Sequence, residues 1–125
     1  IWAKQRLVIG RGHYHFKHEA CWYAVRRGRI AQWKGDRKQT TLWTVAFADG
    51  DDQKWHATQK PLDCMARPIS NHAGDVYDPF LGTGTTLIAA DRLGRTCYGL
   101  ELDPGYCAVV LDRARAHGLD VSLDA

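Results

Sequence analysis

The chain has 125 residues, of which 45% are hydrophobic and 25% charged, and its net charge is +3. This composition is typical of a soluble globular domain and excludes a disordered or fibrous protein. Because no apolar run approaches the roughly 20 residues of a membrane-spanning helix and no targeting segment is visible, we expect a cytoplasmic protein of one domain or part of one.

Positive charge is concentrated near the start of the chain, from Lys4 to Lys38. A basic surface of this kind can bind the phosphate backbone of a nucleic acid, although a solvated loop face has the same composition. The residues that we expect to contact DNA are Arg11, Arg26, Arg27, Arg29 and Lys34.

Three short strands are predicted in this basic part. Residues 2–9 are prone to β structure and lead into a glycine-containing loop. Residues 18–25 are mostly apolar and end before Gly28, which predicts a second strand buried on both faces. The third predicted strand is 42–47, and the polar residues 49–52 follow it as a turn.

Between the second and third predicted strands, residues 29–41 show no periodicity, so we expect a loop. Trp33 lies among the cations of this loop. An aromatic side chain in such a position can stack on a displaced base or clamp a phosphate backbone, and the alternative is that it covers a hydrophobic edge of the sheet.

Several side chains near the start of the chain are of types that zinc accepts, namely His13, His15, His18 and Cys21. Their spacing fits no closed zinc site, so we expect no metal. The cysteines show no Cys-x-x-Cys spacing and lie in apolar contexts, which predicts buried free thiols. They are Cys21, Cys64, Cys97 and Cys107.

A helix is expected to begin at Pro61, whose fixed φ suits the first turn. Pro68 falls within the expected length of this helix, so the helix should either stop near Ala66 or kink. Its apolar side would hold Leu62, Met65 and Ile69.

The segment 76–101 reads as a strand, a glycine turn, a helix and a second strand. The run 82–84, Gly-Thr-Gly, frees the backbone from Cβ hindrance where the first strand must turn into the helix 85–93. The second strand, 96–100, leads directly to Glu101. At the tip of a neighbouring parallel strand, an acidic side chain can accept both hydroxyl hydrogens of a ribose, so we expect an adenosine-bearing cofactor.

The residues after the glycines narrow the choice of cofactor. A nucleotide triphosphate would require a lysine where Thr85 stands, and a dinucleotide would require a glycine where Leu87 stands. The remaining common ligand of such a turn is S-adenosylmethionine. A last helix is expected from Pro104 to Gly118.

Two motifs carry a resemblance to a known family. The segment 78–86 reads Asp-Pro-Phe-Leu-Gly-Thr-Gly-Thr-Thr and resembles the Asp-Pro-Phe-x-Gly-Ser-Gly-Thr-Thr motif of the amino-group DNA methyltransferases, which methylate adenine N6 or cytosine N4. Residues 56–61, His-Ala-Thr-Gln-Lys-Pro, resemble the His-Pro-Thr-Gln-Lys-Pro motif that precedes it in the permuted, beta class. The resemblance implies an α/β, Rossmann-like methyltransferase fold, incomplete here, with a central, mostly parallel sheet and flanking helices.

The resemblance also implies roles for individual residues. Asp78 and the backbone of 80–84 would meet the methionine end of the cofactor, Thr58 and Lys60 its carboxylate, and Glu101 its ribose. Taken singly, such polar turn residues could be purely structural. The expected cofactor-binding set is Thr58, Lys60, Asp78, Phe80, Gly82, Thr83, Gly84 and Glu101.

The catalytic motif of the family, Asp, Ser or Asn followed by Pro-Pro and Tyr or Phe, does not occur in this sequence, so no catalytic residue is assigned. In the permuted order it would lie upstream of Ile1. We therefore expect the chain to be the C-terminal part of a larger methyltransferase, or to work with a partner chain that carries the motif. Residues 1–55 would face double-stranded DNA, and residues 56–125 would form the cofactor-binding βαβ half.

The expected function is site-specific DNA methylation in a bacterial or phage-like cytoplasm. A first alternative is a non-catalytic module that binds cofactor or DNA and has retained the fold. A second is methylation of RNA or of a small molecule.

Overall fold

The computed structural model describes residues 1–46 and 59–123, so the predicted turn 49–52 lies outside the described residues. Strands and helices are both present, in the mixed α/β pattern that we expected. In chain order they are β1 (Trp2–Val8), β2 (Phe16–Glu19), β3 (Trp43–Thr44), α1 (Leu62–Ser70), β4 (Val76–Asp78), α2 (Thr85–Arg92), β5 (Cys97–Gly99) and α3 (Pro104–Ala116). No helix in the described ranges has both the length and the apolarity needed to cross a membrane.

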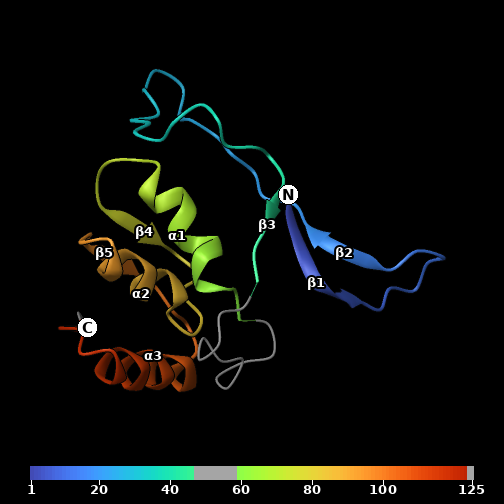
Figure 1. Cartoon of the computed structure of the whole chain (residues 1–125). Helices are drawn as coiled ribbons and strands as arrows, with labels where there is room; N and C mark the ends of the chain where they lie inside the picture. The colour runs from blue at the N-terminus through green and yellow to red at the C-terminus, as the bar shows by residue number, and fades with distance from the viewer. Residues whose placement is uncertain (47–58, 124–125) are drawn as a thin grey trace.

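The strands form two separate sheets in the described part of the chain. β1 pairs antiparallel with β2 and parallel with β3, whereas β4 and β5 form a parallel pair. The β1–β2 hairpin projects from one side of the molecule, and β4 and β5 lie beside α1 and α2 on the other side (Figure 1). The mostly parallel sheet is therefore present as two pieces, one mixed and one parallel.

The second strand lies earlier than predicted. It covers Phe16–Glu19, and residues 20–25 leave the sheet as an exposed segment in which Trp22 is 98% accessible. The prediction of a strand over 18–25 buried on both faces is therefore wrong. An apolar run becomes a buried strand only where neighbours cover it, and no described strand pairs with this run.

The third strand is shorter than predicted within the described residues, because only Trp43–Thr44 pairs with β1. The first hydrophobic cluster is centred on this pairing. It consists of the buried Trp2, Val45 and Cys64, with Trp43 packed against them. The indole N–H of Trp2 donates to the Val45 carbonyl at 3.2 Å, so the buried ring also has its polar group satisfied.

Helix α1 continues through Pro68 to Ser70, so an end near Ala66 is wrong. The proline removes one intrahelical donor, but the last turn is closed by other bonds. The Asn71 N–H donates to the Arg67 carbonyl at 3.3 Å, and the Ser70 hydroxyl donates to the same carbonyl at 2.9 Å.

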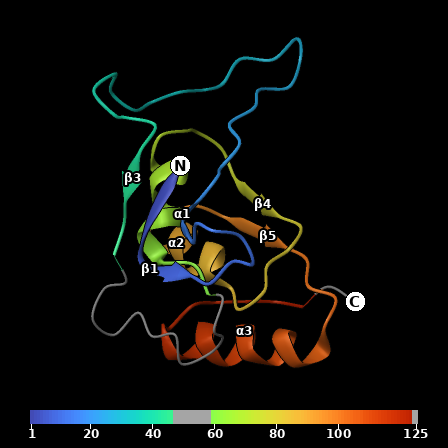
Figure 2. The same ribbon diagram turned by 90° about the vertical axis from the view of Figure 1, so that its right-hand side faces the viewer.

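Packing of α1 on α2 forms the second cluster. Leu62, Ile88 and Ala89 are buried there, and the predicted apolar side of α1 faces them. The partly buried members of this cluster are Met65, Ala66, Ile69 and Leu119. α3 lies below this body in Figures 1 and 2, and the long loop between β2 and β3 lies at the opposite end.

Candidate functional site

The turn between β4 and α2 is tied to the end of β5. The Leu100 N–H donates to the Asp78 carbonyl at 2.9 Å, and the Leu81 N–H donates to the Leu100 carbonyl at 2.9 Å. Gly82 and Gly84 have φ values of +56° and +81°, in the left-handed region that side chains disfavour. A Cβ on Gly84 would also lie 3.3 Å from a methyl carbon of Val110. The turn therefore needs glycine at this position for two independent reasons.

Glu101 lies against this turn. Its Oε2 accepts from the Gly82 N–H at 2.8 Å, and its Oε1 accepts from the Asp103 N–H at 2.9 Å. The strand β5 ends two residues earlier, at Gly99, so the acid follows the strand tip as the sequence predicted. Each carboxylate oxygen has a second lone pair that can accept a ligand hydrogen.

Asp78 and Phe80 lie at the start of the turn. The Phe80 N–H donates to Asp78 Oδ1 at 3.0 Å, so this carboxylate organises the chain entering the glycines. The Phe80 ring is 88% exposed and packs against no buried cluster of the described chain. An exposed aromatic ring beside such a turn can be covered by a ligand or by further polypeptide.

Arg113 of α3 donates hydrogen bonds to the glycine turn and was not among the predicted site residues. Its Nη1 donates to the Thr83 carbonyl at 2.9 Å, to the Thr83 hydroxyl at 3.3 Å and to the Thr85 hydroxyl at 3.1 Å. The residue is only 3% exposed. The one sequence signal was an arginine in register with the apolar positions Val109, Val110 and Ala114 of the helix.

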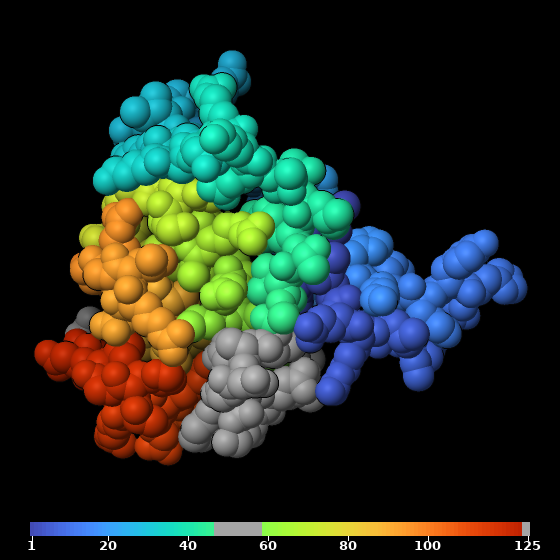
Figure 3. Space-filling model, in the orientation of Figure 1, coloured from blue at the N-terminus to red at the C-terminus, as the bar shows by residue number. Residues whose placement is uncertain are grey.

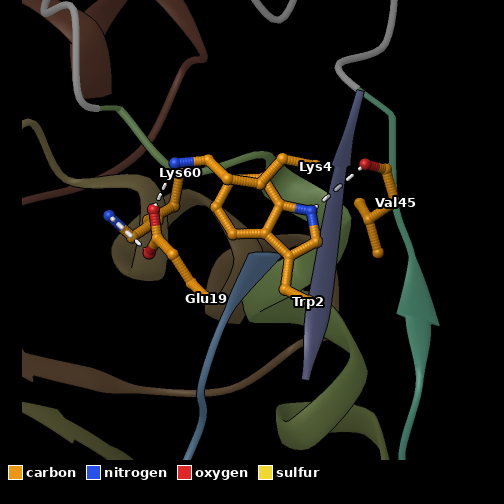
Figure 4. Close-up of polar contacts among 5 residues, drawn as sticks. All are labelled: Trp2, Lys4, Glu19, Val45 and Lys60. Carbon is orange, nitrogen blue, oxygen red and sulfur yellow. Dashed lines mark hydrogen bonds and ion pairs between the residues drawn. The ribbon is translucent and has the colours of Figure 1, made fainter. Parts of the chain in front are cut away.

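Lys60 belongs to an ion cluster that joins β1, β2 and the segment before α1. Lys4 Nζ lies 2.5 Å from Glu19 Oε1, and Lys60 Nζ lies 3.5 Å from Glu19 Oε2 (Figure 4). Burial alone would raise the pKa of Glu19, but the hydrogen bond from Lys4 and the charges of Lys60 and Lys4 lower it overall. Glu19 is therefore ionised at neutral pH.

A cavity of about 830 Å³ connects these parts. Residues from both halves of the chain line it. Gly84 and Glu101 do not line the cavity, but the Glu101 carboxylate accepts a hydrogen bond from Gly82, which does. The expected cofactor residues that line it are Lys60, Asp78, Phe80, Gly82 and Thr83. Thr58 lies outside the described residues.

The five expected DNA contacts are all exposed. Arg11 lies in the β1–β2 hairpin loop, and the other four lie in the loop between β2 and β3. This loop lies above α1 in the view of Figure 3. That loop is anchored at the end of α1. The Lys34 N–H donates to the Asn71 carbonyl at 2.7 Å, and the Asn71 and Gln39 side-chain amides exchange two bonds of 2.7 and 2.8 Å.

An aromatic cluster also lines the cavity. The His72 ring lies between Tyr23 and Trp33, with ring centroids at 5.6 and 5.3 Å, and the Tyr23 hydroxyl is 3.2 Å from His72 Nε2. Trp33 therefore contacts the loop after α1. Its backbone forms an isolated bridge with His72, and the two roles predicted for the ring, stacking on a base and covering a sheet edge, stay predictions.

Within residues 1–46 and 59–123, no three His, Cys, Asp or Glu side chains are placed to hold a metal ion. The hairpin histidine His15 instead accepts from the Gly10 N–H at 3.2 Å. Burial raises the pKa of the Cys64 thiol to about 11 and that of Cys97 to about 11. Cys21 is exposed, so the prediction of a buried thiol there is wrong. No strand among the described residues pairs with the segment that carries it.

Comparison with known proteins identifies the family. A family model for DNA methylases of the N6/N4 type matches residues 12–112. The chain belongs to the amino-group DNA methylase family. Type II methyltransferase M2.DpnII of Streptococcus pneumoniae is 40% identical over 122 residues, which cover 93% of this chain and 41% of that protein.

A second relative, Type II methyltransferase M2.LlaDCHI of Lactococcus lactis subsp. cremoris, is 27% identical over 128 residues, which cover 95% of this chain and 43% of that protein. The chain thus spans less than half the length of these relatives. The crystal structure of the M1.HpyAVI–SAM complex matches 90% of this chain and 58% of that chain, with 27% identity and a TM-score of 0.71. The expected methyltransferase fold is therefore confirmed.

Proposed function

We propose that this chain is the cofactor-binding portion of an S-adenosylmethionine-dependent DNA methyltransferase that methylates adenine N6 or cytosine N4. The observation that carries the proposal is the contact between the Glu101 carboxylate and the N–H of Gly82, in a turn of left-handed glycines. It brings a ribose acceptor and an unhindered backbone to one place. The DNA methylase family model and the SAM complex of a structural neighbour agree with it.

In this proposal the residues divide the cofactor among them. Glu101 binds the ribose hydroxyls, the backbone of 80–84 approaches the sulfonium side, and Asp78 holds the turn in shape. Lys60, with Thr58, binds the carboxylate. The cavity volume of about 830 Å³ lies within the roughly 300–1,000 Å³ range of small-molecule sites.

The cofactor would supply a methyl group on a sulfonium, and the protein would hold the acceptor amine in line with it. Rate enhancement of such a transfer comes from positioning and electrostatics. The polar catalytic group and the ring that stacks on the flipped base would come from further polypeptide of the same protein or from a partner chain. The exposed Trp22 and Phe80 support this arrangement, because further polypeptide would cover them.

Double-stranded DNA is the proposed substrate, in a bacterial or phage-like cytoplasm, and the two relatives described above come from bacteria. Residues 1–55 would face DNA and residues 56–125 would bind the cofactor. The exposed cations of the two loops would contact phosphates, which fixes orientation without reading sequence. They are Arg11, Arg26, Arg27, Arg29 and Lys34.

Calorimetry with S-adenosylmethionine tests the cofactor site. Glu101→Ala should weaken binding roughly tenfold or more, because two hydrogen bonds to a charged acceptor are lost. Glu101→Gln should have a smaller effect, because the amide oxygen can still accept from the Gly82 N–H. Asp91→Ala is the matched control, an exposed acid on α2 that should bind normally. The proposal fails if the unsubstituted chain does not bind the cofactor.

A second candidate is a non-catalytic module that retains the fold and binds cofactor or DNA, for which the same glycine turn and exposed loop cations would suffice. Labelled methyl transfer separates the two. It should be measured on duplex DNA, RNA and free nucleosides, for this chain and for the product of the full reading frame. Counts on duplex DNA support the methyltransferase, background counts for both proteins support the module, and counts on RNA or nucleosides alone support a different substrate.

A further inference from the structure

The β1–β2 hairpin stands clear of the rest of the described chain. Every residue of 5–18 except Gly10 is exposed, so both faces of this two-stranded ribbon are accessible. The hairpin projects to one side of the molecule in Figures 1 and 3. Its base is anchored by the buried Trp2 and by the ion pair between Lys4 and Glu19. A ribbon with two open faces adds nothing to a core, so stabilising the fold does not account for it.

The charge of the hairpin favours one class of partner. Residues 5–18 include Arg6, Arg11 and Lys17 and no aspartate or glutamate. Tyr14 lies among these cations and is 91% exposed. A second copy of this hairpin would bring cations against cations, and an apolar protein surface would leave them without counter-charges. A nucleic acid supplies both phosphates for the cations and bases for the aromatic ring.

Contacts within the hairpin hold its tip in shape. The Gly10 N–H donates to His15 Nδ1 at 3.2 Å across the loop. A Cβ on Gly10 would lie 3.5 Å from the Phe16 ring, so this ring lies close to the loop backbone. Phe16 also lies edge-on to His18, with ring centroids 6.3 Å apart. Because these contacts order the tip before any partner arrives, binding costs less conformational entropy.

The dimensions of the hairpin fit the major groove of B-form DNA. That groove is about 12 Å wide and about 8.5 Å deep, and it admits a two-stranded β-ribbon. The exposed part of β1, residues 5–8, spans at most roughly 13 Å at about 3.3 Å per residue. The ribbon is therefore long enough for its tip to reach base edges while the body of the molecule stays outside the groove.

We propose that the β1–β2 hairpin enters the major groove of double-stranded DNA. Arg6 and Lys17 of the two strands bind phosphates at the groove walls, and Tyr14 contacts base edges at the tip. This rests on the proposed function, because DNA is the substrate there. It adds to the loop cations an element that reaches the bases, where sequence can be read.

The fluorescence anisotropy of labelled duplex DNA, measured over a series of salt concentrations without cofactor, tests the proposal. Arg6→Gln and Lys17→Gln should each weaken binding and reduce the slope of affinity against salt by about 0.9, as expected for one phosphate contact. Tyr14→Ala should weaken binding about fivefold, as for one lost hydrogen bond. Its slope should not change, because no charge is removed. Arg92→Gln is the matched control, an exposed cation of α2 that should alter neither quantity.

A second duplex separates groove entry from contact with phosphates alone. Bulky groups on C5 of its pyrimidines fill the major groove and leave the phosphates and the minor groove accessible. The unsubstituted chain should bind this duplex about fivefold more weakly than the plain one, and Tyr14→Ala should lose most of that difference. Equal binding of the two duplexes by the unsubstituted chain would overturn the proposal in favour of phosphate contacts alone.

Other results would also overturn it. Hairpin variants that bind plain duplex DNA as tightly as the unsubstituted chain would show that the ribbon does not contact DNA. Variants that change the sedimentation coefficient but not DNA affinity would show that it joins two copies of this chain. Urea unfolding checks that the variants fold, and the two duplexes with the unsubstituted chain decide the point without any variant.

Calorimetry with S-adenosylmethionine distinguishes this inference from the proposed function. If the unsubstituted chain binds neither cofactor nor DNA, both fail. If it binds the cofactor and DNA but the hairpin variants and the second duplex change nothing, only the hairpin inference fails. The expected result is normal cofactor binding in all hairpin variants, since residues 5–18 lie outside the cavity lining, together with weakened binding of DNA.

Discussion

The two halves of the chain differ in what determines their structure. In residues 59–123, the strand, glycine turn, helix and strand occur where local patterns predicted them. In residues 1–46, the apolar run 20–25 leaves the sheet and Trp22 lies exposed. Glycine conformation and helix periodicity act over a few residues, whereas a buried strand needs neighbours that are distant in sequence. We therefore expect substitutions to be costly in the second half and mild in the first.

Arg113→Met should have the largest effect. It removes the buried guanidinium that bonds to Thr83 and Thr85, and it leaves the Thr83 carbonyl without that donor. We expect a loss of about 3 kcal/mol of unfolding free energy. Urea unfolding measures it.

Arg115→Met is the matched control on the same helix. Arg115 is exposed and pairs with Asp112 at 3.2 Å, and exposed pairs of this kind contribute less than about 1 kcal/mol. Equal losses in the two variants would mean that the contacts of Arg113 under the turn do not stabilise the fold.

Comparing the stability of Gly84→Ala with that of Gly28→Ala tests the difference between the two halves directly. Both glycines have left-handed φ values, +81° and +77°, but a Cβ at Gly84 meets Val110 at 3.3 Å and one at Gly28 meets nothing within 4 Å. We expect Gly84→Ala to cost about 2 kcal/mol, and Gly28→Ala about 1 kcal/mol or less, because an exposed loop can relax. Thermal unfolding of the two variants measures the difference.

The order of these two costs is the informative result. If Gly28→Ala were the more costly, the first-half loop would be held as rigidly as the glycine turn. The expected difference between the halves would then be absent.

Asn71→Ala should act on the loop of the first half rather than on global stability. The amide exchanges two hydrogen bonds with Gln39, so its removal detaches one anchor, while the Lys34 backbone bond to the Asn71 carbonyl remains. We expect a global loss of about 1 kcal/mol or less, and several-fold faster cleavage by trypsin between residues 26 and 38.

Ser70→Ala is the control for that variant, because the Ser70 hydroxyl donates to the Arg67 carbonyl within the end of α1 and not to the loop. It should leave the trypsin cleavage rate unchanged. Unchanged cleavage in Asn71→Ala as well would show that the side-chain bonds between Asn71 and Gln39 are not what orders the loop, and that the backbone bonds to the Asn71 carbonyl are sufficient.

The same contrast explains how much of the site could be predicted. The glycines and Glu101 are separated by a strand and a helix of standard lengths, so their proximity follows from local patterns. Arg113 lies 30 residues from Thr83, and Glu19 lies still further from Lys60 along the chain. No periodicity links such pairs, and only the tertiary fold brings them together. Trp22 and Tyr23 were predicted to lie in a buried strand but are exposed, for the related reason that burial requires a covering partner.

Glu19 gives the smallest expected effect, a dependence of stability on acid pH. Its pKa lies below the ordinary value of 4.5, because Lys4 and Lys60 outweigh the effect of burial. A carboxylate with a lowered folded-state pKa contributes stability above its unfolded-state pKa, and this contribution is lost as pH falls through the folded-state value. Glu19→Gln should therefore cost less than about 1 kcal/mol at pH 7, since the side chain is partly exposed and its ion pairs are screened. Urea unfolding at a series of pH values from 7 downward measures it.

The difference between the original chain and Glu19→Gln should narrow as pH falls below about 4.5, because the protonated acid then resembles the amide. High salt at pH 7 should narrow it as well, since exposed ion pairs are screened. Asp112→Asn, at an exposed pair on α3, is the matched control and should show a smaller difference throughout. A difference that stays constant from pH 7 to pH 3 would mean that Glu19 stabilises the hairpin by packing rather than by charge, and that the first half is tied to the second without its ion cluster.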